Sequence, residues 1–179
     1  LAKYFKESAD FPGQYRGVRT GINMVAKSDR TGMSEIGSIV GSNEKVLMTT
    51  AEVYFLRAEG ALRGWNMGGT AQSLYEAGIT TSFTQHGASG AAAYIADKVK
   101  MAQDFVDVKD ATNNGAALNK VTIAWNGAAS NEVSLQKIIT QKWIANFPEG
   151  QEAWSEYRRT GYPKLFRALH NTSGGTVTT

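Results

Sequence analysis

Apolar residues recur at helical spacing between residues 47 and 87 and predict two amphipathic helices joined by a short glycine-rich turn. The apolar stripe of the first helix follows the i, i+3, i+4, i+7 pattern and consists of Ala51, Tyr54, Phe55, Ala58, Ala61 and Leu62. The stripe of the second helix consists of Ala71, Leu74, Tyr75, Gly78, Ile79 and Phe83. Glu52, Glu59 and Arg63 fall off the first stripe, so we expect them outside its apolar face.

Both helices carry signals at their ends. Thr49 followed three residues later by Glu52 matches a capping box, whose hydroxyl and carboxylate accept from amides of the first turn. We expect the first helix to stop at Gly64 and the adjacent glycines 68–69 to supply positive backbone angles for the reversal. Thr70 can then cap the second helix.

This pair has tetratricopeptide-like geometry, although the tetratricopeptide consensus is not matched. Small Ala77 and Gly78 allow the two helices to approach closely. Because one pair cannot bury both of its faces, we expect further helical units to pack against it. The predicted fold class is therefore mainly α, with tetratricopeptide-like helical pairs and long irregular loops.

The remainder, residues 88–170, is predicted to be loop-rich with shorter helices. A weaker helix is predicted over residues 94–105, with one face made of Ile95, Val99, Ala102 and Phe105. Residues 107–119 are rich in Asp, Asn and Gly and predict a loop, whereas residues 121–125 are β-prone but short.

Two more helices are predicted towards the end of the chain. The first covers residues 131–146 and has a buried face made of Leu135, Ile138, Ile139 and Trp143. The second, over residues 151–160, is stopped by Gly161 and Pro163. Residues 171–179 form a soft tail.

The composition indicates a globular protein, with 42% apolar and 20% charged residues, and 19 glycines against 3 prolines favour long loops. No apolar run approaches the ~20 residues that span a bilayer, and no leader is visible, so we expect targeting signals upstream or removed. The chain starts with Leu1, and we interpret it as a piece of a longer protein.

Zero cysteines exclude disulfides and thiolate chemistry. The net charge of +3 comes without a dense basic run, which disfavours nucleic acid.

Three patterns suggest chemistry, and each has a simpler explanation. Residues 107–115 faintly resemble an acidic calcium loop, but the ligand spacing is absent and a solvated turn is favoured. Glu149, Glu152 and Glu156 could supply paired carboxylates for glycoside hydrolysis. The same spacing also arises as surface charge on a helix, paired here with arginines 158–159, and that explanation is favoured. His86 and His170 would have to meet for a metal site or relay. We expect no catalytic residue, metal or cofactor.

The tryptophans differ in context. Trp143 and Trp154 lie on helices, where core packing is favoured. Trp65 lies in a loop beside Asn66, and an aromatic face with a neighbouring amide is typical of carbohydrate recognition. A tryptophan at this turn can alternatively plug the groove to the next helical pair.

Two further loop positions are candidates for glycan contact. Trp125 ends an apolar segment and precedes a turn. Tyr15 and Arg16 form an aromatic and polar pair between glycines. A purely structural role is the alternative for each of them.

Four blocks of this chain, in order, resemble the SusD/RagB-like proteins. The match covers most of residues 10–166, and its blocks are residues 15–21, 48–83, 138–148 and 150–166. The sequences Tyr15-Arg-Gly-Val-Arg-Thr-Gly21 and Gln151-Glu-Ala-Trp-Ser-Glu-Tyr-Arg-Arg-Thr-Gly-Tyr-Pro163 are typical of these blocks. The resemblance implies that residues 1–179 are the carboxy-terminal portion of a SusD-like domain, a fragment of its α-superhelix.

The resemblance also implies a function. Members of this family are surface-exposed outer-membrane lipoproteins that capture an oligosaccharide and pass it to a SusC-like TonB-dependent transporter, without catalysis. The only membrane attachment implied is a lipid anchor on the amino-terminal part, which this chain lacks. Family sugar contacts come from variable loops, so no site residue is transferred.

Two hypotheses remain. In the first, the chain belongs to a glycan-binding protein that uses loop aromatics and amides. In the second, helical repeats present a surface to a protein or peptide, or the ligand is a peptide, as for some members of the family.

Overall fold

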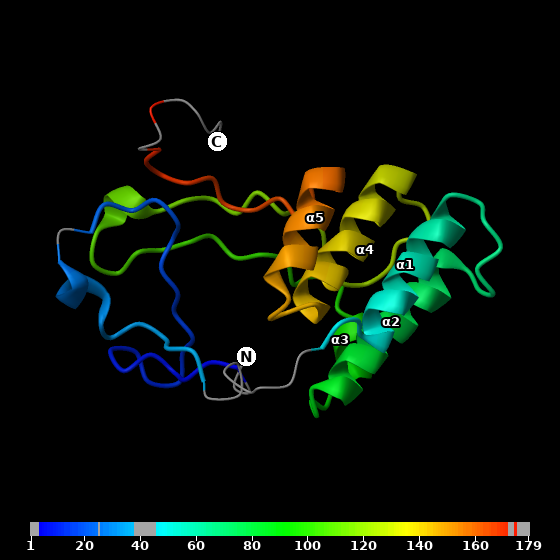
Figure 1. Cartoon of the computed structure of the whole chain (residues 1–179), viewed down its shortest axis with the longest axis horizontal. Coiled ribbons are helices and arrows are strands. Elements are labelled where there is room, and N and C mark those ends of the chain that lie inside the picture. Colours follow the sequence, from blue (N-terminus) through cyan, green and yellow to red (C-terminus); the bar gives the residue numbers. More distant parts are fainter. Residues whose placement is uncertain (1–3, 25, 38–45, 172–173, 175–179) are drawn as a thin grey trace. The chain divides into compact units, whose positions relative to one another are not determined.

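The structure, a computed structural model, describes residues 4–24, 26–37, 46–171 and 174, and the chain divides into two compact units (Figure 1). The first, here the loop unit, consists of Leu1–Glu44, Gln103–Leu118 and Leu165–Thr179. The second, here the helical unit, consists of Lys45–Ala102 and Asn119–Lys164. All α-helices of the described residues lie in the helical unit and no strand forms among those residues, which confirms the mainly α prediction.

The predicted helical pair is present as α1 (Thr50–Leu62) and α2 (Ala71–Gln85), which pack against each other. Gly78 of α2 permits close packing, because a Cβ there would lie 2.8 Å from Cε1 of Phe55. The Phe55 ring also meets the Tyr75 ring edge-on, with centroids 6.3 Å apart. The close approach predicted at residue 78 is confirmed.

Threonines cap both helices of the pair as predicted, but the Glu52 carboxylate does not complete the capping box expected with Thr49. The hydroxyls of Thr49 and Thr70 each accept from the backbone N–H three residues later, at 3.1 Å. Gly64 and Gly68 adopt positive φ values of 85° and 72° in the connecting turn. Gly69 does not, so the expectation of two adjacent left-handed glycines was wrong.

The last two predicted helices are α4 (Asn131–Ala145) and α5 (Gly150–Thr160), and both predictions are confirmed. Helix α4 packs against α1, α2 and α5. Gly161, at φ 70°, ends α5. The buried core of this unit consists of Ala51, Phe55, Ala58, Leu74, Tyr75, Ile79, Ile123, Ile138, Ile139, Ala145 and Tyr162.

The prediction of a helix over residues 94–105 was wrong. The structure has a single short helix here, α3 (Ala91–Ile95). Just after it, Oδ1 of Asp97 accepts from the backbone N–H groups of Val99 and Lys100, at 2.9 and 2.8 Å. These local bonds offer the backbone an alternative to the helix, which therefore stops.

The β-prone residues 121–125 form a buried turn. The carbonyl of Ile123 accepts from the Tyr75 hydroxyl at 2.7 Å. The carbonyl of Ala124 accepts from Nζ of Lys137 at 2.9 Å. Side chains of α2 and α4 thus satisfy carbonyls that a sheet would otherwise pair.

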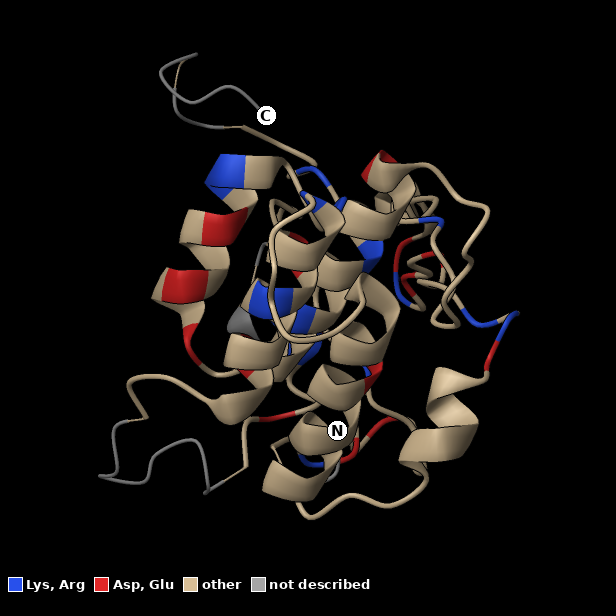
Figure 2. Cartoon of the chain, turned by 90° about the vertical axis from the view of Figure 1, so that its right-hand side faces the viewer, with Lys and Arg blue, Asp and Glu red and all other residues tan. Residues whose placement is uncertain are grey.

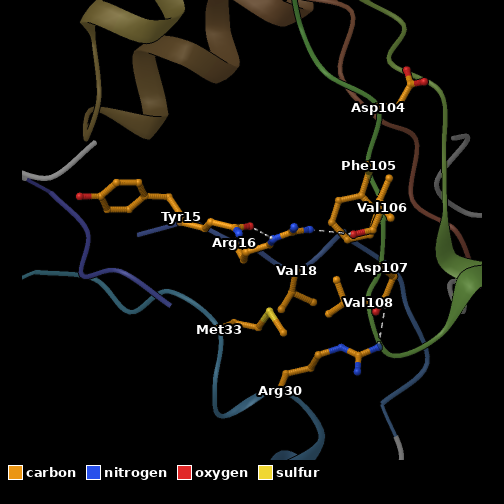
Figure 3. Close-up of a pocket in the computed structure, with 12 residues that line it drawn as sticks. Tyr15, Arg16, Val18, Arg30, Met33, Asp104, Phe105, Val106, Asp107 and Val108 are labelled. Carbon is orange, nitrogen blue, oxygen red and sulfur yellow. Dashed lines mark hydrogen bonds and ion pairs between the residues drawn. The ribbon is translucent and has the colours of Figure 1, made fainter. Parts of the chain in front are cut away.

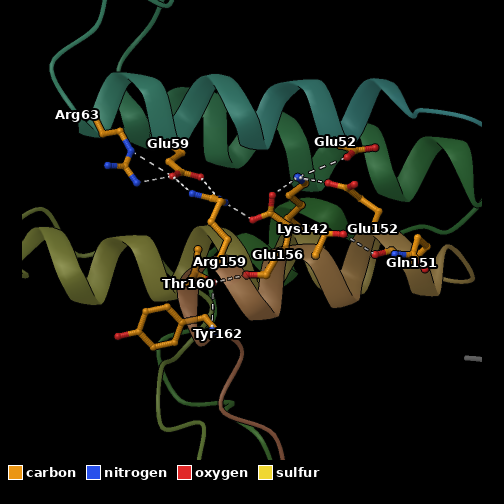
Figure 4. Close-up of polar contacts among 11 residues, drawn as sticks. Glu52, Glu59, Arg63, Lys142, Gln151, Glu152, Glu156, Arg159, Thr160 and Tyr162 are labelled. Carbon is orange, nitrogen blue, oxygen red and sulfur yellow. Dashed lines mark hydrogen bonds and ion pairs between the residues drawn. The ribbon is translucent and has the colours of Figure 1, made fainter.

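The expectation that Glu52 lies outside a buried face was wrong. Glu52 is 6% exposed, and its carboxylate lies 3.4 Å from Nζ of Lys142, which is itself buried on α4 (Figure 4). The same ammonium group pairs with Glu152 at 3.0 Å and Glu156 at 2.9 Å, both on α5. Burial raises the pKa of Glu52, and Lys142 only partly offsets that effect.

Glu59 is likewise buried, at 6% exposure, because it faces α5. Its two carboxylate oxygens accept from Nη1 and Nη2 of Arg159, both at 2.7 Å, and Arg63 adds two guanidinium bonds to Oε1, at 3.1 and 2.7 Å (Figure 4). Arg159 also binds Glu156 at 2.6 Å, the pairing expected on α5, although Glu156 is buried and not at the surface. Figure 2 shows acidic and basic positions interspersed along the described helices.

The prediction that Trp143 and Trp154 pack in the core was wrong. They are 38% and 53% exposed. The buried stripe of α4 includes polar residues that an apolar pattern misses, and it consists of Ser134, Lys137, Ile138, Ile139, Gln141, Lys142 and Ala145. The buried residue of α5 is Glu156, and Trp154 instead stacks on Tyr157 with centroids 6.1 Å apart.

The loop unit is held together by hydrogen bonds between its separate segments. Arg19 donates from Nη1 to the carbonyls of Asn113 and Asn114, both at 3.0 Å. The backbone N–H groups of Leu169 and His170 donate to residues 20–21 at 3.1 and 3.0 Å. Short 3-10 helices of this unit include η1 (Lys27–Arg30) and η3 (Ala111–Asn113). Within the described ranges, no helix is long and apolar enough to cross a membrane.

Candidate functional site

A cavity of about 290 Å³ lies in the loop unit and includes two of the predicted site residues, Tyr15 and Arg16 (Figure 3). Its size is at the lower end of ordinary ligand pockets. The lining residues come from three segments and are Gln14, Tyr15, Arg16, Gly17, Val18, Arg30, Met33, Asp104, Phe105, Val106, Asp107 and Val108.

Residues 104–108 form one wall of the cavity. Phe105 exchanges two backbone hydrogen bonds with Gly115, at 2.8 and 3.0 Å. The carboxylate of Asp104 accepts from the N–H of Ala117 at 2.8 Å, and the Phe105 ring meets Phe166 at 6.2 Å. These contacts fix the position of the wall within the loop unit.

Asp107, near the end of this wall, accepts the hydrogen bonds that hold the turn after it. Its Oδ1 accepts from the N–H groups of Lys109 and Asp110, at 2.9 and 3.2 Å. Its Oδ2 accepts from Arg30 at 2.8 Å and from the Asn113 amide at 2.9 Å. Burial alone would raise the pKa of Asp107, but these donors outweigh burial and lower it.

The acidic segment 107–115 is a largely exposed turn, as expected, but the carboxylate of Asp107 and the amide of Asn113 are buried within it. Because Asp107 already accepts four bonds, its oxygens are occupied by donors within the chain. In the part of the chain that the structure describes, no cluster of three or more His, Asp or Glu residues is arranged to hold a metal ion.

Arg16 is the best-placed polar side chain of the cavity. Its Nε donates to Oε1 of Gln14 at 2.9 Å, and its guanidinium lies over the Phe11 ring at 5.1 Å. Its Nη1 reaches the Val106 carbonyl only at 3.5 Å, a long and weak bond. In the described part of the chain Nη2 makes no hydrogen bond.

Tyr15 lines the cavity differently from its neighbour. Figure 3 shows its ring extending away from the other labelled side chains, whereas Arg16 extends towards Phe105 and Val106. Phe105 therefore supplies the aromatic surface of the cavity. No sequence pattern marks Phe105 as a site residue, because its position near Arg16 depends on bringing distant segments together.

Trp65 and Asn66 lie in the turn between α1 and α2, in the helical unit. The Trp65 side chain is 62% exposed, and its backbone N–H donates to the Gly60 carbonyl at 3.0 Å. Oδ1 of Asn66 accepts from the N–H of Gly68 at 3.4 Å. The indole is thus presented to solvent from a hydrogen-bonded turn.

Trp125 is half-buried in the helical unit. Its ring lies 5.2 Å from the Tyr75 ring and packs against the core of that unit. The structure brings only Tyr15 and Arg16 of the predicted site residues into one cavity. A second cavity in the helical unit, between Phe55 and Tyr94, measures about 40 Å³ and is too small for a sugar ring.

The family model for SusD-like proteins, described as Susd and RagB outer membrane lipoprotein, matches residues 1–179. The chain therefore belongs to this family of outer-membrane lipoproteins. The family consists of non-catalytic binding proteins, as the resemblance in the sequence implied.

Solved structures extend this finding. A chitin-binding SusD homologue from Flavobacterium johnsoniae is 65% identical, with a TM-score of 0.95 over 98% of this chain and 36% of its own. SusD homologues from Bacteroides uniformis and Bacteroides thetaiotaomicron are 44% and 36% identical, with TM-scores of 0.85 and 0.89. Those matches cover 99% and 97% of this chain and 37% of each homologue. The chain thus spans little more than a third of these relatives. Comparison with curated proteins gives no match.

Proposed function

We propose that this chain is the carboxy-terminal part of a cell-surface protein that binds an oligosaccharide rich in N-acetylglucosamine. The observation that carries the proposal is the 65% identity, over 98% of the chain, to a chitin-binding SusD homologue. In this proposal the captured oligosaccharide passes to a partner SusC-like TonB-dependent transporter of the outer membrane.

Two features of the described residues support glycan binding. Trp65 exposes 62% of its surface on a turn fixed by backbone bonds, so its ring can stack on a sugar without a large loss of conformational freedom. Arg16 and the aromatic Phe105 line a cavity of about 290 Å³. We propose Trp65, Asn66, Trp125, Tyr15 and Arg16 as the residues to test for glycan contact.

The test is calorimetric titration of the full chain with oligomers of N-acetylglucosamine, glucose and mannose. Binding of at least one glycan is expected, and Trp65→Ala should weaken it about tenfold, because aromatic contacts dominate such interfaces. Trp154→Ala is the matched control, since Trp154 is 53% exposed but lies on α5.

The outcomes separate the hypotheses. Equal loss of affinity in both tryptophan variants would point to a general effect and not to a Trp65 site. If no glycan binds and the same preparation captures a peptide, the proposal is overturned in favour of the peptide-binding alternative. Co-purification with the SusC-like transporter of the same organism tests the transfer step separately.

A further inference from the structure

The cavity of the loop unit has an aliphatic side. Figure 3 shows the side chains of Val18, Met33 and Val108 pointing towards one another. Val18 and Val108 are each 42% exposed, whereas Met33 is buried at 8%. A small apolar group that entered here would remove valine surface from water, which is favourable.

The polar side of the same cavity offers a hydrogen-bond donor. The guanidinium of Arg16 is held by Gln14 and by the Phe11 ring, at 2.9 and 5.1 Å. Its Nη1 has only the 3.5 Å contact with the Val106 carbonyl. A carbonyl oxygen of a ligand can therefore accept from a guanidinium that is already oriented.

We propose that this cavity recognises the acetamido group of an N-acetylated sugar, an inference that rests on the proposed glycan binding. The methyl group contacts Val18 and Val108, and the amide oxygen accepts from Arg16. A hydroxyl in place of the acetamido group has no methyl group to place against Val18 and Val108, so it gains none of this apolar contact. The cavity therefore selects N-acetylated glycans over plain glucans.

The first test compares two ligands on the unmodified full chain. Oligomers of N-acetylglucosamine and β-1,4-linked glucose oligomers of equal length differ at each ring only in the acetamido group. We expect the N-acetylated oligomer to bind at least about tenfold more tightly, the discrimination available from a small apolar group in a pocket.

Variants then test whether the cavity causes the preference for N-acetylated oligomers. Val18→Thr keeps the shape of the side chain but replaces a methyl by a hydroxyl, so the ratio of the affinities for the N-acetylated and glucose oligomers should fall several-fold. Arg16→Gln should reduce it further. Val99→Thr is the matched control, because Val99 is 79% exposed and lies in the helical unit.

Each result is decisive. Equal affinity for the two oligomers would overturn the acetamido assignment and leave glycan binding intact. An N-acetyl preference that survives both Val18→Thr and Arg16→Gln would overturn the cavity as its source. Absence of binding to both oligomers would overturn the proposed function and this inference with it.

Discussion

Nζ of Lys142 lies 2.9 Å from Oε1 of Glu156, and both side chains are buried between α4 and α5. Glu52 of α1 lies 3.4 Å from the same ammonium group. Burial alone would lower the pKa of Lys142, but hydrogen bonds from it to Glu156 and Glu152 outweigh burial and raise it. One charged lysine thereby connects three helices.

Lys142→Met should destabilise the chain by about 3–5 kcal/mol, because it leaves buried carboxylates without a partner. Denaturant unfolding followed by circular dichroism measures this loss. Adding Glu52→Gln and Glu156→Gln should recover part of it, since the unpaired charges are then gone. Lys100→Met, at a lysine that is 78% exposed, is the control and should change stability by less than about 0.5 kcal/mol. Similar unfolding midpoints for both single variants would contradict the role of Lys142.

Glu59 makes stability depend on acid pH. Burial alone would raise the pKa of Glu59, but hydrogen bonds from Arg159 and Arg63 outweigh burial and lower it. Because the folded pKa lies below the unfolded value, the stabilisation is complete above the unfolded pKa and is lost as pH falls through the folded pKa.

Arg159→Gln should raise the pKa of Glu59 towards its ordinary value, so acid unfolding should begin at a higher pH. A pH titration of helical circular dichroism measures the midpoint. Arg158→Gln is the control, because Arg158 lies over the Trp154 ring and not beside Glu59. An unchanged midpoint for Arg159→Gln would show that Arg63 alone sets the pKa of Glu59.

Gly78→Ala should destabilise the α1 and α2 pair by about 1–3 kcal/mol, because the new Cβ would lie 2.8 Å from the Phe55 ring. Thermal unfolding measures the effect, and Phe55→Leu in the same chain should relieve part of the overlap. Gly127→Ala, where a Cβ meets nothing within 4 Å, is the matched control. If the Gly78→Ala variant is as stable as the control, the two helices can move apart without loss of stability.

The apolar pattern predicted the extents of α1 and α2 well, because the residues that join the two helices are apolar and the caps are local. It missed the buried carboxylates of Glu52 and Glu59 on α1. The same pattern predicted the extents of α4 and α5 but missed the charged residues of their buried faces, Lys142 and Glu156. Those charges are buried only because partners from other helices meet them, and spacing along one helix cannot show this. Arg16 was a predicted site residue, but its cavity was not, because Phe105 reaches it from a distant segment.

Asp107→Asn should loosen the wall of the cavity without unfolding the helical unit. The substituted amide cannot accept at both positions, so Arg30 or the N–H groups of Lys109 and Asp110 lose a partner. Leaving a buried donor unsatisfied costs about 1–3 kcal/mol, which is enough to favour local opening of this turn. Hydrogen exchange should therefore speed up at Lys109 and Asp110 while α1 stays protected.

The matched variant is Asp110→Asn, because Asp110 is exposed and its side chain binds only Thr112, at 2.9 and 2.6 Å. If the cavity binds the glycan, Asp107→Asn should also weaken that binding, since the wall that carries Val106 and Val108 extends directly from Asp107. Faster exchange with unchanged glycan affinity would separate the two effects: the carboxylate would then order the loop, and the sugar would bind elsewhere.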